Sequence, residues 1–306
     1  MRTRHLPVMA KEVVELLRVR PGGTYVDATV GGGGHARAIL EAAGSARLVG
    51  FDRDPRALVA AKKELEAWSD RVVLLYANFS ELMTKLSDLQ VDEVDGIVFD
   101  LGVSTFQLAE RERGFTYQDP YAPLDMRMDP TLPNTAADLL NTLDRRELAD
   151  IFRRFGEERW ASRIADFVVR FRAHRPFRSS GQLVECIKAA VPAAARRAGG
   201  HPARRVFQAL RIAVNDELGH LERALPQAMR LLKVGGRVVV ISFHSLEDRR
   251  VKQAFLRAEC EGQPVRMRVV TRKPLVPGPS EVAENPRARS ARLRCAERVA
   301  APQDGA

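Results

Sequence analysis

The chain has 306 residues, and 49 lysines and arginines against 39 aspartates and glutamates give it a formal net charge of +10 at pH 7. No apolar run reaches the ~18 residues that a membrane-spanning helix needs, and the first eleven residues lack the apolar core of a secretion signal. The three cysteines lie far apart and outside C-x-x-C spacing, which argues against a metal site and a disulfide framework. These features predict a globular protein of a reducing cytoplasm, without a membrane or a bound metal.

Strand and helix patterns alternate over the first hundred residues. Continuous apolar runs predict buried strands, and the amphipathic stretches between them predict helices. The predicted strands are 24–29, 48–51, 71–77 and 95–100, and the predicted helices are 36–40, 55–67 and 81–86. Such an alternation is typical of a parallel sheet that helices cover on both faces.

The alternation stops after the fourth strand. Residues 103–134 are rich in proline, glycine and polar groups, and residues 135–215 carry helical patterns with candidate caps at Asp144 and Ser179. A helix at 216–232, a strand at 237–243 and a helix at 245–258 then follow, with two late strand candidates at 265–271 and 291–299. The sequence therefore predicts a doubly wound α/β sheet interrupted by a helical insertion.

Four adjacent glycines, Gly31–Gly34, separate the first strand from a helix. Such a run predicts a turn without side-chain bulk, where a ligand can approach bare backbone. Asp52 ends the second strand about twenty residues later, where a carboxylate can accept hydrogen bonds from ribose hydroxyls. The run is not a strict G-x-G-x-x-G, because Ala36 holds the last position. A tight surface turn, a nicotinamide dinucleotide site and an S-adenosylmethionine site all remain open.

Further polar or aromatic residues follow the other predicted strands, at the edge where parallel sheets bind ligands. Phe79 is a candidate for stacking on an adenine ring or for anchoring the core. Asp100 is a candidate for accepting hydrogen bonds from an amino group at the reaction centre, or for capping a turn. His35 and His244 lie at predicted helix starts, where capping and ligand contact are both open.

The positive charge is clustered. Residues 262–306 hold nine lysines and arginines against four acidic residues, which favours a polyanionic partner such as nucleic acid over an evenly solvated basic surface. A second cluster flanks a Gly-Gly-His-Pro stretch at 199–202, where we expect a flexible basic loop. The clustered arginines are Arg287, Arg289, Arg292 and Arg294 in the tail, and Arg196, Arg197, Arg204 and Arg205 in the helical region.

Eight sequence motifs in order resemble the bacterial ribosomal RNA small-subunit methyltransferase H family, also called MraW. The resemblance covers nearly the whole chain, from about His5 to Arg298. The motifs are TVGGGGH (29–35), FDRDP (51–55), DLGVS (100–104), PLDMRMDP (123–130), FGEER (155–159), FQALR (207–211), ISFHSLEDR (241–249) and ENPRARS (284–290).

This resemblance implies an S-adenosylmethionine-dependent enzyme that methylates N4 of a cytidine in the decoding region of small-subunit ribosomal RNA. It implies a Rossmann-like methyltransferase domain at 1–108 and 212–306, interrupted by a helical RNA-recognition domain at 109–211. The partner would be the ribosomal RNA or the assembled small subunit, and a homodimer is compatible with the sequence. A methyltransferase for another RNA or a protein, a non-catalytic ribosome-assembly factor and a nicotinamide oxidoreductase are the alternatives.

The family's residue roles can be placed on matching positions of this chain. The loop at Thr105-Phe106-Gln107 departs from the family's frequent Ser-Pro-Gln but keeps the glutamine. Asp100 is the candidate catalytic residue, although no residue is established as a base. The implied cofactor contacts are Gly33, Gly34, His35, Asp52, Phe79, Asp100 and Gln107. The candidate RNA contacts are Arg127, Arg204, Arg205, His244, Arg287 and Arg289.

Overall fold

A computed structural model describes residues 7–104, 107–108, 110–197, 200–260 and 265–300. The chain divides into two compact units, which we call unit 1 (Met1–Gly102 and Leu218–Ala306) and unit 2 (Val103–Glu217). The boundaries expected from the sequence, 108/109 and 211/212, each fall six residues inside unit 2. The difference arises because Val103 and Leu108 already pack against the helical core, and because helix α11 (Arg204–Asn215) runs on past residue 211.

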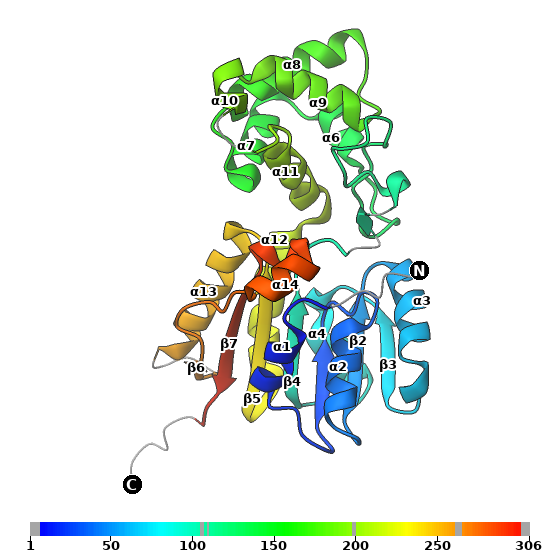
Figure 1. Ribbon diagram of the computed structural model, residues 1–306, viewed down its shortest axis with the longest axis vertical. Coiled ribbons are helices and arrows are strands. Elements are labelled where there is room, and N and C mark those ends of the chain that lie inside the picture. The colour runs from blue at the N-terminus through cyan, green and yellow to red at the C-terminus, as the bar shows by residue number, and fades with distance from the viewer. Residues whose placement is uncertain (1–6, 105–106, 109, 198–199, 261–264, 301–306) are drawn as a thin grey trace. The chain divides into compact units, whose positions relative to one another are not determined.

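Within the described residues, unit 1 is built on a seven-stranded sheet with the order β3-β2-β1-β4-β5-β7-β6 (Figure 1). Strands β1 to β5 run parallel, and β7 runs antiparallel to both β5 and β6. The strand order reverses between β1 and β4, so a ligand-binding crevice is expected at the carboxyl ends of these two strands. The strands are β1 (Thr24–Asp27), β2 (Arg47–Asp52), β3 (Val72–Tyr76), β4 (Val94–Asp100), β5 (Leu232–Ser242), β6 (Met267–Val269) and β7 (Arg292–Arg298).

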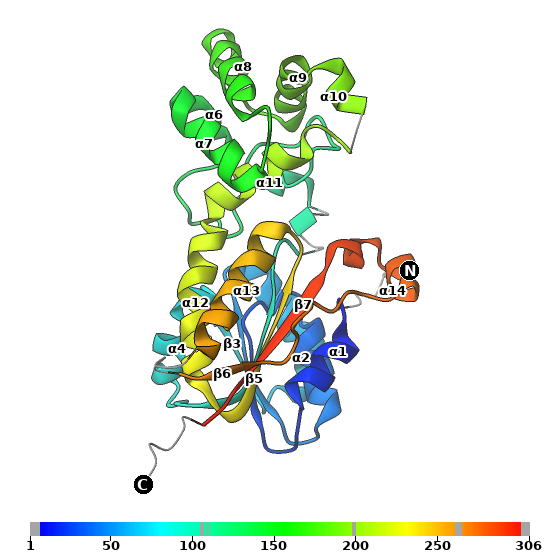
Figure 2. The ribbon, with the colours of Figure 1, turned by 90° about the vertical axis from the view of Figure 1, so that its left-hand side faces the viewer.

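Helices cover both faces of this sheet, which confirms the doubly wound α/β fold. Figure 2 shows α1 and α2 on one side of the sheet and α4, α12 and α13 on the other. Val26 of β1 is in register with Val49 of β2 and Ile97 of β4, and all three are buried in the core under α12. The covering helices are α1 (Ala10–Leu17), α2 (Gly34–Ala42), α3 (Pro55–Glu64), α4 (Leu82–Asp88), α12 (Glu217–Leu231) and α13 (Ser245–Glu259).

Strand alternation explains why nearly every residue of the central strands is apolar. Tyr25 and Leu48, next to Val26 and Val49, face the opposite core, together with Ile39 of α2. Burying one such side chain contributes about 1.5–3 kcal/mol, so both faces of each strand stabilise the fold.

Unit 2 is helical throughout its regular structure. Its core includes Leu148 and Phe152 from one helix and Ile164 and Leu183 from two others, all fully buried. The predicted caps at Asp144 and Ser179 are confirmed, each as part of a capping box. The helices are α6 (Ala136–Thr142), α7 (Arg145–Gly156), α8 (Ala161–His174), α9 (Ser180–Ala190), α10 (Ala193–Arg197) and α11.

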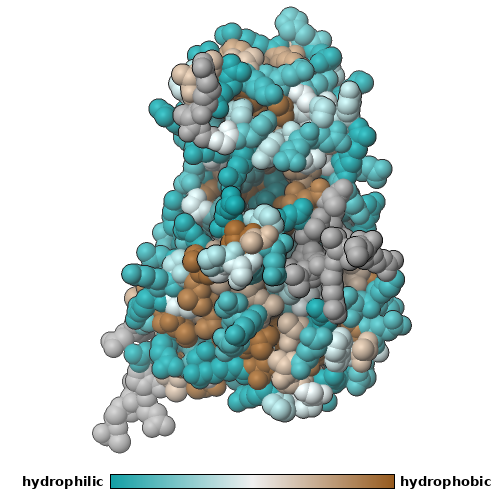
Figure 3. Space-filling model, viewed as in Figure 1, coloured by the Kyte–Doolittle hydropathy of each residue, from teal (hydrophilic) through white to brown (hydrophobic). Residues whose placement is uncertain are grey.

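Short elements account for most differences from the sequence prediction. Helices α1, α10 and α14 (Pro279–Glu284) were not expected, and β5 starts at Leu232, five residues earlier than its apolar core suggests. None of the helices in the described residues is long and apolar enough to cross a bilayer. On the face of each unit seen in Figure 3, hydrophilic side chains predominate, as expected for a chain with 29% charged residues.

Candidate functional site

The glycine run forms the predicted turn between β1 and α2. Gly31 and Gly33 have φ angles of 51° and 87°, the left-handed region in which a side chain is strained. A Cβ on Gly33 would also approach the side chain of Leu65 to 3.3 Å and the backbone of Ala61 to 3.4 Å. Glycine is therefore required at this position both by the backbone conformation and by the packing of α2 against α3.

Asp52 closes this turn from the end of β2. Its Oδ2 accepts a hydrogen bond of 2.9 Å from the Gly31 N–H, and its Oδ1 accepts one of 2.8 Å from the Asp54 N–H. Each carboxylate oxygen has a second lone pair, so both can still accept from a ligand hydroxyl. Asp52 lies where a ribose-binding carboxylate is expected, and its role in binding stays a prediction.

Two carboxylates at the ends of β1 and β4 each carry an oxygen without a hydrogen-bond partner. Asp27 is 1% exposed, and its Oδ1 accepts from the Thr29 N–H while Oδ2 is orphaned. The Oδ1 of Asp100 is likewise buried and orphaned. The Asp100 backbone N–H donates to Thr29 Oγ1 at 2.6 Å, which ties the β1 turn to the end of β4. An unmet buried acceptor costs about 1–3 kcal/mol, which a ligand donor would recover.

His35 lies at the first turn of α2 and faces Asp100. It is 4% exposed, and its Nε2 lies 2.8 Å from the carbonyl oxygen of Val8. Because a carbonyl only accepts, Nε2 carries the proton, and Nδ1 faces Asp100 Oδ2 at 3.6 Å. The buried imidazole is thus fixed by the Val8 carbonyl, with Nδ1 turned towards the Asp100 carboxylate.

The first turn of α13, which follows β5, adds a fourth acidic group that the sequence did not place at the site. Glu247 is 2% exposed, and its Oε2 accepts from the backbone N–H groups of Phe243 at 2.8 Å and His244 at 3.3 Å. His244 is the N-cap of α13 and forms a capping box with Glu247. The cap gives His244 a structural role, and the spacing of three residues to a glutamate in the sequence indicates such a cap. Its Nε2 is buried without a hydrogen-bond partner among the described residues, and its contact with RNA stays a prediction.

Phe79 follows β3 and is half-buried. Its ring packs edge-on against Phe99, with centroids 5.7 Å apart, and against His220 at 6.4 Å. Asn78 is the N-cap of the short helix that begins at Phe79, and its side-chain oxygen accepts from the Ser80 N–H. The side-chain oxygen of Asn78 therefore has a structural role, whereas Phe79 remains a candidate for stacking.

We call the group formed by Asp27, Asp52, Asp100 and Glu247 the acidic edge, and its negative charge favours a cation. Burial, together with the smaller effect of the nearby charges of Asp100 and Asp52, raises the pKa of Asp27 to about 6. Burial likewise raises the pKa of Asp52 to about 6. Burial and then the charge of Glu247 raise the pKa of Asp100 to about 7. A pyrophosphate would add negative charge to this cluster, whereas a sulfonium and an ammonium would neutralise it, which disfavours the nicotinamide dinucleotide.

Gln107, the remaining predicted cofactor contact, belongs to unit 2. It is 6% exposed, and its Oε1 accepts from the Ser104 N–H at 3.0 Å while its own N–H donates to Ser104 Oγ at 3.2 Å. These two bonds close a local turn. The Thr105-Phe106 departure from the family pattern lies outside the described residues. Contact between Gln107 and a cofactor stays a prediction.

The three arginines predicted as RNA contacts in unit 2 differ in what their guanidinium groups do. Arg127 pairs bidentately with Asp125 at 2.9 and 2.8 Å and also donates to the carbonyls of Pro130 and Leu132, which gives it a structural role. Arg204 and Arg205 begin α11 and are exposed, although Arg205 donates to the backbone carbonyl of Glu157, the C-cap of α7, at 3.0 Å. Exposed guanidinium groups can meet phosphates, so these two keep their predicted role.

The tail arginines separate into exposed and buried groups. Arg287 and Arg289 lie exposed on either side of buried Ala288. Arg294, in contrast, is 6% exposed on β7 and donates to both oxygens of Asp248 at 2.6 and 3.2 Å. The expectation that all the clustered tail arginines face a polyanion is therefore wrong for Arg294. Asp248 lies in the first turn of α13, so this buried ion pair joins β7 to that helix.

Comparison with known proteins decides the family. The family model described as "MraW methylase family" matches residues 2–299. The chain belongs to the MraW methylase family. It is 52% identical to a protein of Symbiobacterium thermophilum named ribosomal RNA small subunit methyltransferase H, over 98% of each chain. It is 53% identical to a Geobacter sulfurreducens protein of the same name, over 96% of this chain and 99% of that one.

The cofactor of a methylase of this family is S-adenosylmethionine, and the residues present fit it. The two orphaned oxygens, Asp27 Oδ2 and Asp100 Oδ1, lack donors. An ammonium and ribose hydroxyls are donors, and a sulfonium is a cation for the acidic edge. The backbone at Gly31 leaves room for the approach of a ligand, because the nearest atom to a Cβ there would be the Thr29 carbonyl oxygen, at 3.8 Å.

Proposed function

We propose that the protein methylates the exocyclic N4 of a specific cytidine in the decoding region of small-subunit ribosomal RNA. The observation that carries the proposal is the cluster of raised-pKa carboxylates beside the glycine turn, in a chain of the MraW methylase family. The names of the relatives support a small-subunit ribosomal RNA substrate. The positive charge of the chain supports a polyanionic partner.

The bound S-adenosylmethionine would supply an electrophilic methyl carbon attached to a positively charged sulfur. Asp52 would hold the ribose through the two carboxylate oxygens that already accept from Gly31 and Asp54. Asp27 and Asp100 would hold donor groups of the cofactor at their orphaned oxygens. Positioning dominates such a reaction, because an amine held about 3–3.5 Å from the carbon, in line with the leaving group, reacts far faster than a free one.

The nucleophile is weak because the N4 lone pair of cytosine is delocalised into the ring. A hydrogen-bond acceptor near N4 would stabilise the positive charge that develops there as the N–C bond forms. Asp100 is our candidate, because its ionised carboxylate would accept from N4 at a lone pair that the cofactor leaves free. It would then hold the proton that N4 releases, once methyl transfer has removed the charge of the sulfonium. The target base must leave its stack to reach this edge.

Mass spectrometry of ribosomal RNA nucleosides with and without the gene is the decisive experiment. The strain that lacks the protein should lose one N4-methylated cytidine of the small-subunit RNA, and wild-type protein should restore it while Asp100→Asn should not. Purified protein should then be assayed on naked RNA and on assembled subunits to define the substrate. An unchanged set of modifications would refute the proposal and leave a non-catalytic assembly role.

A further inference from the structure

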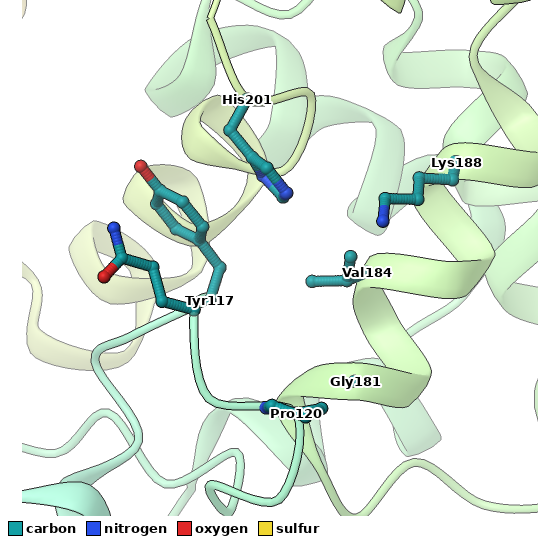
Figure 4. Close-up of a pocket in the computed structure, with 7 residues that line it drawn as sticks. Tyr117, Pro120, Gly181, Val184, Lys188 and His201 are labelled. Carbon is teal, nitrogen blue, oxygen red and sulfur yellow. The ribbon is translucent and has the colours of Figure 1, made fainter.

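Unit 2 contains a cavity of its own, which we call the Tyr117 pocket (Figure 4). Its volume of about 470 Å³ lies within the ~300–1,000 Å³ of small-ligand sites. In Figure 4, Tyr117 and His201 lie on one side of the cavity, Val184 and Lys188 on the other, and Pro120 and Gly181 at its base. The lining residues are Tyr117, Gln118, Pro120, Gly181, Val184, Lys188 and His201, all from unit 2.

Two stacked rings form one wall. The rings of Tyr117 and His201 lie 4.6 Å apart with an interplanar angle of 13°, and Tyr117 packs edge-on against Phe207 at 5.7 Å. His201 Nδ1 accepts from the Ala203 N–H at 3.3 Å, so the neutral ring carries its proton on Nε2. Burial and then the charge of Lys188 lower the pKa of His201, which keeps this ring neutral. The pair is a rigid aromatic surface with one donor at its edge.

The base of the pocket is held by a close backbone contact. The Gly181 N–H donates to the Pro120 carbonyl oxygen at 2.9 Å, and a Cβ on Gly181 would approach that oxygen to 2.7 Å. Glycine at this position therefore lets α9 pack directly on the loop at residue 120. The pocket is fixed by three separate chain segments rather than by one loop.

The polar groups of the pocket suit a nucleotide. Lys188 is exposed on α9, and no ion pair to it occurs within the described parts of the chain. An unpaired ammonium beside an aromatic surface can meet a phosphate while the ring supports a base. Gln118 is exposed and offers both a donor and an acceptor to a base edge. Aromatic stacking is how proteins hold unpaired RNA bases.

We propose that the Tyr117 pocket binds one unpaired nucleotide of the RNA substrate, distinct from the cytidine that is methylated. The base stacks on the Tyr117–His201 pair and its phosphate meets Lys188. This inference rests on the proposed function for its RNA substrate. It differs from that function in its location, because the carboxylates proposed to hold the methyl donor, Asp27, Asp52 and Asp100, lie in unit 1, whereas the pocket is built wholly from unit 2.

Photocrosslinking tests the stacking directly. Decoding-region RNA carrying 5-iodouridine at one single-stranded position at a time is irradiated with the full-length protein, and the crosslinked peptide is sequenced by mass spectrometry. One position other than the target should crosslink to Tyr117 or His201, because this chemistry requires an aromatic ring against the base. Crosslinks that form only at other residues, although the RNA binds, would overturn the proposal.

Equilibrium binding tests the energetics. Tyr117→Leu should weaken RNA binding by about 5- to 150-fold, the range for loss of one stacked base, whereas Tyr117→Phe should keep the affinity. Lys188→Gln should lower the salt slope of binding by about 0.7, the value for one phosphate on a single strand. Lys252→Gln, an exposed lysine on α13, is the matched control and should leave the slope unchanged. Thermal unfolding of each variant separates a binding defect from a folding defect.

The outcomes separate this proposal from the proposed function. Wild-type methylation combined with normal RNA affinity of Tyr117→Leu and Lys188→Gln would refute the pocket and leave the function standing. Failure of the wild-type protein to bind decoding-region RNA would refute both. A raised KM for RNA with an unchanged kcat in the two variants would support a binding role away from the reacting atoms.

Discussion

The raised pKa values of the acidic edge predict that S-adenosylmethionine binds more tightly as the pH rises from 5 to 7. Asp100 has a pKa of about 7 without ligand, so at pH 5 almost every molecule carries a proton on it. The cofactor is a cation, and it binds the ionised carboxylate better than the neutral acid. Binding must therefore release a proton, and the affinity must fall as protons compete for the site.

The size of the change in cofactor affinity follows from the pKa of Asp100. A group with a pKa of about 7 is half-ionised at pH 7 and about 1% ionised at pH 5, so the affinity should change about 50-fold, or ~2.3 kcal/mol. Asp27 and Asp52, each with a pKa of about 6, add to the change below pH 6. About 50-fold is thus the value for Asp100 alone when the cofactor binds only the ionised carboxylate. At pH 6, Asp100 alone should release about 0.9 proton per cofactor bound.

Isothermal titration calorimetry measures both quantities, the affinity from each isotherm and the proton release from the enthalpy in buffers of different ionisation enthalpy. Asp100→Asn should weaken binding at pH 7 and flatten the pH dependence. Asp92→Asn, which changes an exposed carboxylate just before β4, should match the wild type. An affinity independent of pH between 5 and 7, or the same slope in Asp100→Asn, would refute the reasoning.

Three further predictions concern single side chains. Asp52→Ala should weaken cofactor binding by calorimetry at least tenfold, because two turn N–H groups and the ribose lose their acceptor; unchanged affinity would remove Asp52 from the site. Asp27→Asn should raise the free energy of unfolding of the cofactor-free protein at pH 8 by up to ~3 kcal/mol, with little change at pH 4. The sign follows because a folded pKa of about 6 exceeds the unfolded value, so native stability falls as the pH rises through that window; denaturant titrations at both pH values check it. Replacing Arg287 and Arg289 with alanine should weaken RNA binding and reduce its salt slope. Arg294→Ala should instead lower the melting temperature, because the buried Asp248 carboxylate loses its buried partner and keeps only the exposed Arg292, at 3.3 Å. The opposite pattern would contradict the burial argument.

Local patterns were sufficient for most of the fold. The apolar runs that became β1, β2 and β4 are continuous because helices cover both faces of the sheet. Each of these strands could therefore be predicted from its own residues, without knowledge of the neighbouring strands. In a parallel sheet, carboxyl ends of strands share one edge, and this rule alone brought Asp52 and Asp100 to the same region. The Gly31–Gly34 run could be recognised as a turn because glycine adopts positive φ angles, such as those of Gly31 and Gly33, with less strain than other residues.

The domain boundaries were harder to predict from the sequence. A helix pattern reports which residues are apolar, but it does not report which core they join. Val103 and Leu108 follow a strand of unit 1 in sequence, yet they pack in the core of unit 2. Contacts between residues far apart in sequence decide such boundaries.

Side-chain roles were decided by the tertiary structure. The sequence presents Arg289 and Arg294 as members of one basic cluster, but only the folded chain buries Arg294 against Asp248, 46 residues away. The folded chain also brings the charge of Glu247 close to Asp100, where it raises the pKa of Asp100. The sequence by itself determined the elements and the residue types at each strand end, because these depend on neighbours in the chain. Burial, ion pairing and the Tyr117 pocket depend on distances between remote segments, and only the tertiary structure sets those.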